Sequence, residues 1–241
     1  DSFTIGSEGA INAGGVNFVG WSWKESATAG FDIVTYSGSG ATNISHNLSA
    51  IPKFMIVKRY SATESWFAYN GGLGQAKVGY LNDSVAWGSG TNVWGGSDPT
   101  SSVFSIGSDS GISGSGDYVA FLFADIQGYQ KSGIYEGSGS TTDNTFVYLG
   151  FKPAMIIVKA VDTANQWNVF DNKRNTGNPM DKRLFADSTD AETTYASFDF
   201  LSNGFKVRNT SVGIGTADTF MYYAVAEAPF VNSKGVPCNA R

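Results

Sequence analysis

Short apolar runs separated by small polar residues dominate the chain. Residues 54–57 (FMIV) and 155–158 (MIIV) are continuous runs rich in β-branched side chains, and apolar residues flank the turn-forming segment 202–204 (SNG). Runs of this length, bounded by Gly, Ser and Asn, predict buried strands and tight hairpins. Residues 180–201 are long enough for a helix, but they lack a 3.6-residue period and are rich in Thr, Ser and Asp. The pattern therefore favours strands there as well.

Composition agrees with an all-β protein. Charged residues make up only 15% of the 241 residues and aromatic residues 14%, and 30 glycines punctuate the apolar runs. The residues that usually build helix surfaces, Glu, Lys, Arg and Ala, are scarce by comparison. We therefore expect antiparallel β-sandwiches of the jelly-roll-like kind.

The chain repeats itself after about 101 residues. Residues 52–58 (PKFMIVK) return as residues 153–159 (PAMIIVK), and Trp66 returns as Trp167 at the same offset. A period near 100 residues is the size of one β-sandwich rather than of a solenoid repeat. The sequence predicts two tandem homologous units, each with this strand and its tryptophan in its core.

A further element occurs three times. Residues 3–7 (FTIGS) return as 104–108 (FSIGS) and, more loosely, as 205–207 (FKV), and each copy leads into an aromatic stretch ending in an acid. These stretches are residues 21–25, 121–125 and 223–227. Two units of this period leave an extra N-terminal hairpin, which either belongs to a preceding unit or fills a strand vacancy in this chain. We place the first unit at residues 1–127, with this hairpin, and the second at 128–241.

Several motifs resemble a family of bacteriophage proteins. They are residues 30–40 (GFDIVTYSGSG), 45–48 (SHNL), 51–58 (IPKFMIVK), 98–104 (DPTSSVF), 199–206 (DFLSNGFK) and 226–230 (AEAPF). Together they resemble the repeated β-domain of tail fibres and other virion structural proteins of tailed phages, especially those of marine bacteria. The resemblance implies a virion location, an adhesin-like role and a homo-oligomer, most simply a trimer along a fibre axis. It also implies the C-terminal end of such a protein, with residues 237–241 as the finish.

Net charge and residue counts exclude several kinds of partner and cofactor. The net charge is −5 and the pI is about 4.8, which provides no basic surface for nucleic acid. No apolar run approaches the ~20 residues of a membrane span, so we expect no membrane insertion. The chain has one Cys and one His, so no internal disulfide forms and a His-rich metal site is excluded. We expect no metal and no cofactor.

Candidate catalytic groups are few. A Ser-His-Asp or Cys-His system needs a histidine, and the only one, His46, is expected to be a solvent-facing turn residue. Cys238 lies near the end of the chain. Acids gather in two loop regions without calcium-loop spacing, and we interpret them as solvated: Asp98, Asp109 and Asp117, and Asp181, Asp187, Asp190 and Glu192. We expect no catalytic residue and no enzyme.

Aromatic residues give the best candidate for binding. Trp87 and Trp94 lie in a Gly-rich loop that has no aromatic counterpart in the second unit, with Asn92 and Asp98 nearby. Indole rings can cover the C–H face of a sugar while amide and carboxylate groups hold its hydroxyls. We predict that these four residues bind a ligand. The alternative is that both indoles cap the end of the sandwich.

Two classes of function remain open. The first is a non-enzymatic tail-fibre or virion surface module that attaches to a host-cell glycan receptor and contacts other virion proteins. Its structural variant is a spacer or assembly part of the virion. The second is a polysaccharide-degrading tail enzyme, which the near absence of His and the unpaired positions of the acids disfavour.

Overall fold

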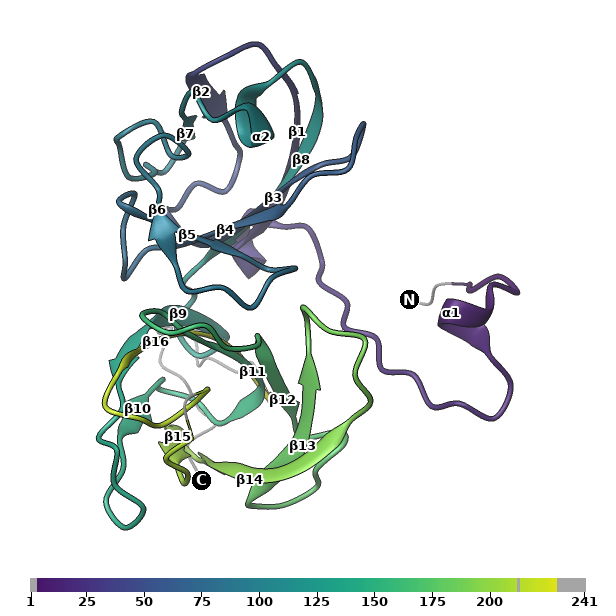
Figure 1. Ribbon diagram of the computed structural model, residues 1–241, viewed down its shortest axis with the longest axis vertical. Coiled ribbons are helices and arrows are strands. Elements are labelled where there is room, and N and C mark those ends of the chain that lie inside the picture. The colour runs from purple at the N-terminus through teal and green to yellow at the C-terminus, as the bar shows by residue number, and fades with distance from the viewer. Residues whose placement is uncertain (1–3, 212, 229–241) are drawn as a thin grey trace.

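The protein is built almost entirely from antiparallel β-strands. The computed structural model describes residues 4–211 and 213–228 (Figure 1). Strands β1–β8 form one rounded body, the N-terminal half, and strands β9–β16 form a second, the C-terminal half. The all-β prediction is confirmed.

The N-terminal half has a six-stranded sheet and a two-stranded one. The larger sheet has the order β1-β8-β3-β4-β5-β6, and β2 pairs with β7. A 3₁₀ turn, η1 (Ala27–Ala29), leads into the first strand, and α2 (Ser110–Ser113) precedes the last. The strands are β1 (Phe31–Gly38), β2 (Thr42–Ser45), β3 (Pro52–Arg59), β4 (Trp66–Asn70), β5 (Lys77–Tyr80), β6 (Gly88–Ser89), β7 (Val103–Ile106) and β8 (Gly116–Ala124).

The C-terminal half is one eight-stranded sheet that curls until it is nearly a barrel. Its order is β10-β15-β14-β13-β12-β11-β16-β9. The strands are β9 (Gln130–Glu136), β10 (Phe146–Tyr148), β11 (Pro153–Ala160), β12 (Asn168–Asp171), β13 (Met180–Phe185), β14 (Thr193–Leu201), β15 (Gly204–Val207) and β16 (Thr219–Ala226). Residues 180–201 therefore contain two strands and the loop between them rather than a helix, as expected, and β14 and β15 form the predicted hairpin.

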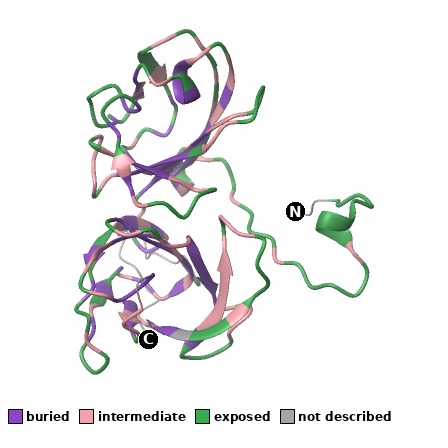
Figure 2. Cartoon of the chain, in the orientation of Figure 1, coloured by how far each residue is buried: buried purple, intermediate pink, exposed green. Residues whose placement is uncertain are grey.

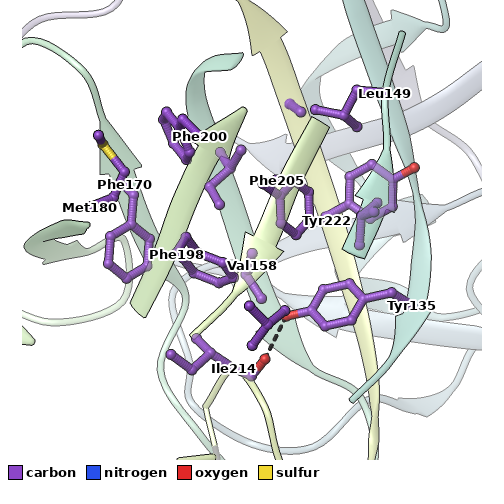
Figure 3. Packing of buried hydrophobic residues seen from close by; sticks show 14 of the residues in the cluster. Tyr135, Leu149, Val158, Phe170, Met180, Phe198, Phe200, Phe205, Ile214 and Tyr222 are labelled. Carbon is purple, nitrogen blue, oxygen red and sulfur yellow. Dashed lines mark hydrogen bonds between the residues drawn. The ribbon is translucent and has the colours of Figure 1, made fainter. Parts of the chain in front are cut away.

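Aromatic rings fill the interior of the C-terminal half (Figure 3). Phe205 meets Phe198 and Tyr135 edge-on, with ring centroids 5.5 and 5.8 Å apart. The Tyr135 hydroxyl donates a hydrogen bond to the carbonyl oxygen of Ile214 at 2.7 Å. The phenol thus keeps a partner in an otherwise apolar core, as a buried polar group requires.

The two halves pair corresponding residues in the same way. In β3 and β4, Phe54 lies opposite Asn70; in β11 and β12, Met155 lies opposite Asp171, which is the same pair shifted by 101 residues. Both β3 and β11 have an irregularity directly after their proline, where they pair with β8 and β16. The order β1-β8-β3-β4-β5 thus recurs as β9-β16-β11-β12-β13.

An apolar core joins the two halves. It contains Phe54 and Phe123 from the N-terminal half, and Met155, Trp167 and Tyr223 from the C-terminal half. The ring centroids of Phe54 and Tyr223 are 5.3 Å apart, and those of Phe123 and Tyr223 are 5.0 Å apart. The outer faces of two corresponding sheets are therefore buried against each other.

The N-terminal segment, residues 4–25, lies mostly outside both halves. Figure 1 shows it running away from the body of the protein to α1 (Gly9–Asn12), and Figure 2 shows it as largely exposed. Only its C-terminal part, around Trp21 and Trp23, reaches the space between the halves. No residue of the segment belongs to either half's sheets, so it fills no strand vacancy in the described part of this chain.

Candidate functional site

The most conspicuous surface feature is an apolar groove between the halves, with a volume of about 440 Å³. Its walls come from outward-facing residues of both sheets, including Ile33 and Trp66 on one side and Ile157 on the other. Trp21 and Trp23 of the N-terminal segment line it as well. Ile33 is 39% exposed, Trp66 36% and Trp21 39%, so apolar surface is open to solvent here.

Polar groups lie at the ends of the groove. At one end Trp66 and Leu81 continue into a hollow of about 320 Å³ that includes Asn82. At the other end Trp21 and Trp23 continue into a hollow of about 250 Å³ whose lining includes Asn172 and Lys173. The centre therefore suits apolar surface, and amide and charged side chains lie only in the adjoining hollows.

A buried polar junction fixes the two walls relative to each other. The Gln130 side-chain amide donates to the carbonyl oxygens of Gly30 and Ala124 at 2.8 and 2.7 Å. Its oxygen accepts from the Tyr223 hydroxyl at 3.0 Å, and that hydroxyl accepts from the Trp23 indole N–H at 3.2 Å. Gln130 and Tyr223 are 1% and 2% exposed and their side-chain polar atoms are hydrogen-bonded, which favours one geometry of the junction. Burial also raises the pKa of Tyr223, which stays a neutral donor.

A second contact ties β4 to β9. The amide of Asn70, which is fully buried, donates to the Ser132 hydroxyl at 2.9 Å, and that hydroxyl donates to the Tyr222 carbonyl oxygen at 2.9 Å. Both sets of hydrogen bonds therefore hold the two halves together beside the groove.

The groove offers no acid–base chemistry. Apart from the weakly acidic Tyr223, its central lining has no titratable side chain. In the described part of the chain, no three His, Cys, Asp or Glu residues gather closely enough to hold a metal ion. No helix of the same residues is long and apolar enough to cross a membrane.

The most perturbed cation, Lys159, lies in the interior. It is 1% exposed, and burial lowers its pKa to about 8, with Asp187 and Asp83 acting in the opposite direction. Its ammonium donates to the carbonyl oxygen of Ala160 at 3.0 Å. Perturbed lysines are often catalytic, but a side chain this enclosed meets no substrate in this structure.

The two predicted binding indoles are buried on opposite faces of the same sheet. Trp94 is 1% exposed in the N-terminal core, where its ring meets Tyr69 edge-on and its N–H donates to the Lys77 carbonyl oxygen at 3.0 Å. Trp87 is 4% exposed in the core between the halves, 5.8 Å from Trp167. The structure does not bring the two rings together, and their burial favours the alternative of end-cap packing.

Asn92 and Asp98 are both exposed, and both anchor loops. The Asn92 carbonyl oxygen accepts from the Asp109 backbone N–H at 3.0 Å. One Asp98 oxygen accepts from the Tyr69 hydroxyl at 3.1 Å and from the Gln75 backbone N–H at 2.7 Å. Binding of a ligand by these four residues stays a prediction, without a shared surface to support it.

Most of the loop acids are likewise bound to neighbours. Asp109 caps α2, Asp117 accepts from Ser37, Asp181 from Asn175, Asp187 from the Trp167 backbone, Asp190 from Gln166, and Glu192 pairs with Arg174. These acids organise turns, so the expectation that they are simply solvated was incomplete. Cys238 and residues 237–241 lie outside the described residues.

His46 corrects another expectation, because it is buried rather than solvent-facing. It is 6% exposed, its Nδ1 accepts from the Leu48 backbone N–H at 3.3 Å, and its Nε2 lies 3.3 Å from the Thr100 carbonyl oxygen. These partners suit a neutral ring that donates through Nε2. Burial lowers the pKa of His46, which agrees with a structural role.

Trp66 is the binding candidate that the sequence pattern missed. Its repetition as Trp167 predicted a core position for both, and Trp167 is fully buried, but Trp66 is 36% exposed. The Trp167 indole donates to the Tyr80 carbonyl oxygen at 2.8 Å across the junction of the halves. Because a repeat places both rings on the outer face of a sheet, only the packing of the halves decides which ring is covered.

Fold and site together define an all-β protein with an apolar groove between two halves. The chain belongs to the family described as a domain of unknown function (DUF7483), whose model matches residues 1–229. The match includes the N-terminal segment, both halves and the groove. No curated protein and no solved structure shows significant similarity to the chain.

Proposed function

We propose that the chain is a non-enzymatic structural module of a phage virion appendage, and that its groove binds another protein unit of that assembly. The observation that carries the assembly role is the groove, because open apolar surface with polar groups only at its rim is what protein interfaces bury. The virion location rests on the resemblance of the sequence motifs to tail-fibre proteins.

We also propose that the chain consists of two tandem homologous units, at 1–127 and 128–241. The shared registers of β3/β4 and β11/β12 and the recurring strand order support this reading. Each half encloses its own apolar core, as a sandwich-like or jelly-roll-like unit should.

Purified phage particles test the location. Mass spectrometry of the particles should detect the chain, and antibody labelling in the electron microscope should place it on a surface appendage. A protein that is made during infection but absent from particles would contradict the proposal. Incubation of the purified protein with host polysaccharide should release no reducing sugar, and release would identify an enzyme instead.

Attachment to a host glycan is the second candidate, and Trp66 is the observation that favours it. Its half-exposed ring lies beside Asn82, whose side-chain oxygen accepts from the Trp66 backbone N–H at 2.7 Å. An open indole next to an amide suits a sugar ring. Trp66→Ala should then weaken binding to host cells by about 1–3 kcal/mol without a large change in Tm. Equal binding by wild type and variant would remove this candidate.

That the protein forms a homotrimer stays a prediction, which rests on the resemblance to tail-fibre proteins. The chain's many aromatic residues do not by themselves require a trimer, because the core between the halves places aromatic rings from both outer sheet faces in one cluster. Light scattering of the full-length protein at micromolar concentration tests it, and a monomer would contradict it.

A further inference from the structure

One helical turn occurs three times with the same hydrogen bonds. In the N-terminal segment the Glu8 carbonyl oxygen accepts from the backbone N–H groups of Ile11 and Asn12 at 3.1 and 2.9 Å. The carbonyl oxygens of Asp109 and Ser211 accept the corresponding bonds in the two halves, at 3.1 and 3.0 Å in each. In each half this turn connects β7 to β8 or β15 to β16.

The connection that follows is also repeated. Between β8 and β9, Ile126 and Gln130 exchange two backbone hydrogen bonds of 2.9 and 3.0 Å. Ser26 and Phe31 exchange two of 2.9 and 3.1 Å between the N-terminal segment and β1. The N-terminal segment is therefore connected to β1 in the same way as β8 is connected to β9.

The N-terminal segment differs from the corresponding residues of the N-terminal half in how far its apolar side chains are buried. Ile11 and Phe18 are each 50% exposed, whereas the corresponding Ile112 and Tyr118 are fully buried in the core of the N-terminal half. The segment thus has the residues of a closing strand, the helical turn that precedes such a strand and the connection that follows it, but not the sheet that would cover it.

The sheets of this chain cannot supply that cover. In the N-terminal half β8 already lies between β1 and β3, and in the C-terminal half β16 already lies between β9 and β11. A second copy of the chain has the same filled positions. The missing partner is therefore a unit with this strand order that lacks its own last strand.

The groove marks where such a unit would pack. Trp21 and Trp23 correspond to Phe121 and Phe123 on the outer face of β8, and all four line the groove. The rings of Trp23 and Phe123 meet edge-on at 6.0 Å. We propose that residues 4–25 are the closing strand of a third β unit, which precedes them on the same polypeptide and covers the groove. This inference rests on the proposed function, since it names the partner that the groove binds.

A chain with an added unit tests the proposal. Residues 31–103 are placed directly before Phe3, so that Phe3 follows Val103 as Phe104 does in the native sequence. We expect a monomer in which the added residues fold. Backbone amides of residues 17–24 should exchange with solvent about 100-fold more slowly than in the parent chain. Trp21 and Trp23 should become less accessible to acrylamide.

Two controls make the outcome decisive. Ile11→Asp with Phe18→Asp should leave the parent chain unchanged, because both side chains are half-exposed there, but should unfold the added unit in the extended chain. A second chain, with residues 31–125 joined to Ser26, gives the added unit its own last strand and shows whether the added residues can fold at all.

The proposal is overturned if the second control folds while residues 31–103 stay protease-sensitive in the test chain and residues 17–24 exchange as in the parent. Exchange of segments between two chains, seen as a dimer, would overturn it as well. Neither outcome depends on a virion location, which the particle experiment tests separately.

Discussion

At the scale of single residues, burial decides what each tryptophan does. Trp87 and Trp94 are almost fully enclosed, whereas Trp66 has more than a third of its surface open. An enclosed indole stabilises the fold through its contacts, and an open one is available to a partner. Burial thus divides the tryptophans of the N-terminal half into two that pack in cores and one with open surface.

The burial of Trp87 and Trp94 predicts a stability effect. Trp87→Ala and Trp94→Ala should each lower the free energy of unfolding by about 3–5 kcal/mol, because each leaves a large cavity. Trp66→Ala is the matched control and should have a much smaller effect. Urea denaturation of the three variants measures this. A loss of host-cell binding by folded Trp87→Ala or Trp94→Ala at unchanged stability would instead restore ligand contact.

The buried ammonium of Lys159 predicts a dependence of stability on pH. Because its pKa in the folded protein is about 8 and its ordinary value is 10.5, the unfolded chain binds more protons above pH 8. The free energy of unfolding should therefore rise as the pH increases from 8 to about 10, above which the buried tyrosines oppose the trend.

Lys159→Met isolates this contribution. The variant keeps the packed chain but loses the buried charge, so it should be more stable than wild type at pH 7, and the rise between pH 8 and 10 should become smaller. Chemical denaturation at several pH values measures both. An identical pH profile in wild type and variant would show that the ammonium is solvated in the folded state.

At the scale of elements, the same close approach of two backbone segments occurs in each half. A Cβ atom at Gly38 would collide with the carbonyl oxygen of Gly114, and one at the corresponding Gly137 would collide with that of Thr216. Since neither oxygen lies on a flexible side chain, the backbone itself would have to move.

Alanine substitution at these glycines should therefore destabilise both halves alike. Gly38→Ala and Gly137→Ala should each lower the free energy of unfolding by at least about 1–3 kcal/mol. Gly88→Ala is the control, because no atom lies within 4 Å of a Cβ placed there. A neutral effect at only one of the two positions would argue against equivalent turns.

The elements were easier to predict than the site. Short β-branched runs and Gly-rich turns determine strands locally, so the strand character of residues 180–201 and the hairpin at 202–204 could be foreseen. The groove could not, because Ile33, Trp66 and Ile157 lie on outer sheet faces whose covering depends on how two halves meet. Periodicity within one strand contains no information about that contact.

His46 illustrates the same limit. Its neighbours Ser45 and Asn47 are typical of a solvent-exposed turn, yet the ring is buried between the backbone of Leu48 and that of Thr100, 54 residues away. A partner that distant in sequence leaves no local pattern.

At the scale of the whole molecule, the junction couples the halves. If either half unfolds alone, the apolar core between the halves and the Gln130 hydrogen bonds are lost. Each half contributes groups to this junction that are buried only when the halves are together. Exposing this apolar surface is unfavourable, so a species with one folded half should not accumulate. We predict one cooperative unfolding transition, seen at the same urea concentration by near-UV circular dichroism and by far-UV circular dichroism.

Gln130→Leu should break that coupling, because it leaves the buried carbonyl oxygen of Ala124 without this donor and the Tyr223 hydroxyl without this acceptor, while the Gly30 carbonyl oxygen keeps the Ala124 backbone N–H. Each unsatisfied group costs about 1–3 kcal/mol, and the cost falls on the junction rather than on either separate core. The two circular-dichroism transitions should then separate or the combined transition broaden, with a lower m value. Gln127→Leu is the matched control, since Gln127 is exposed in the same turn and should leave the transition unchanged. Two resolved transitions in the wild-type protein would show instead that the halves are independent, and that the groove between them is not a fixed surface.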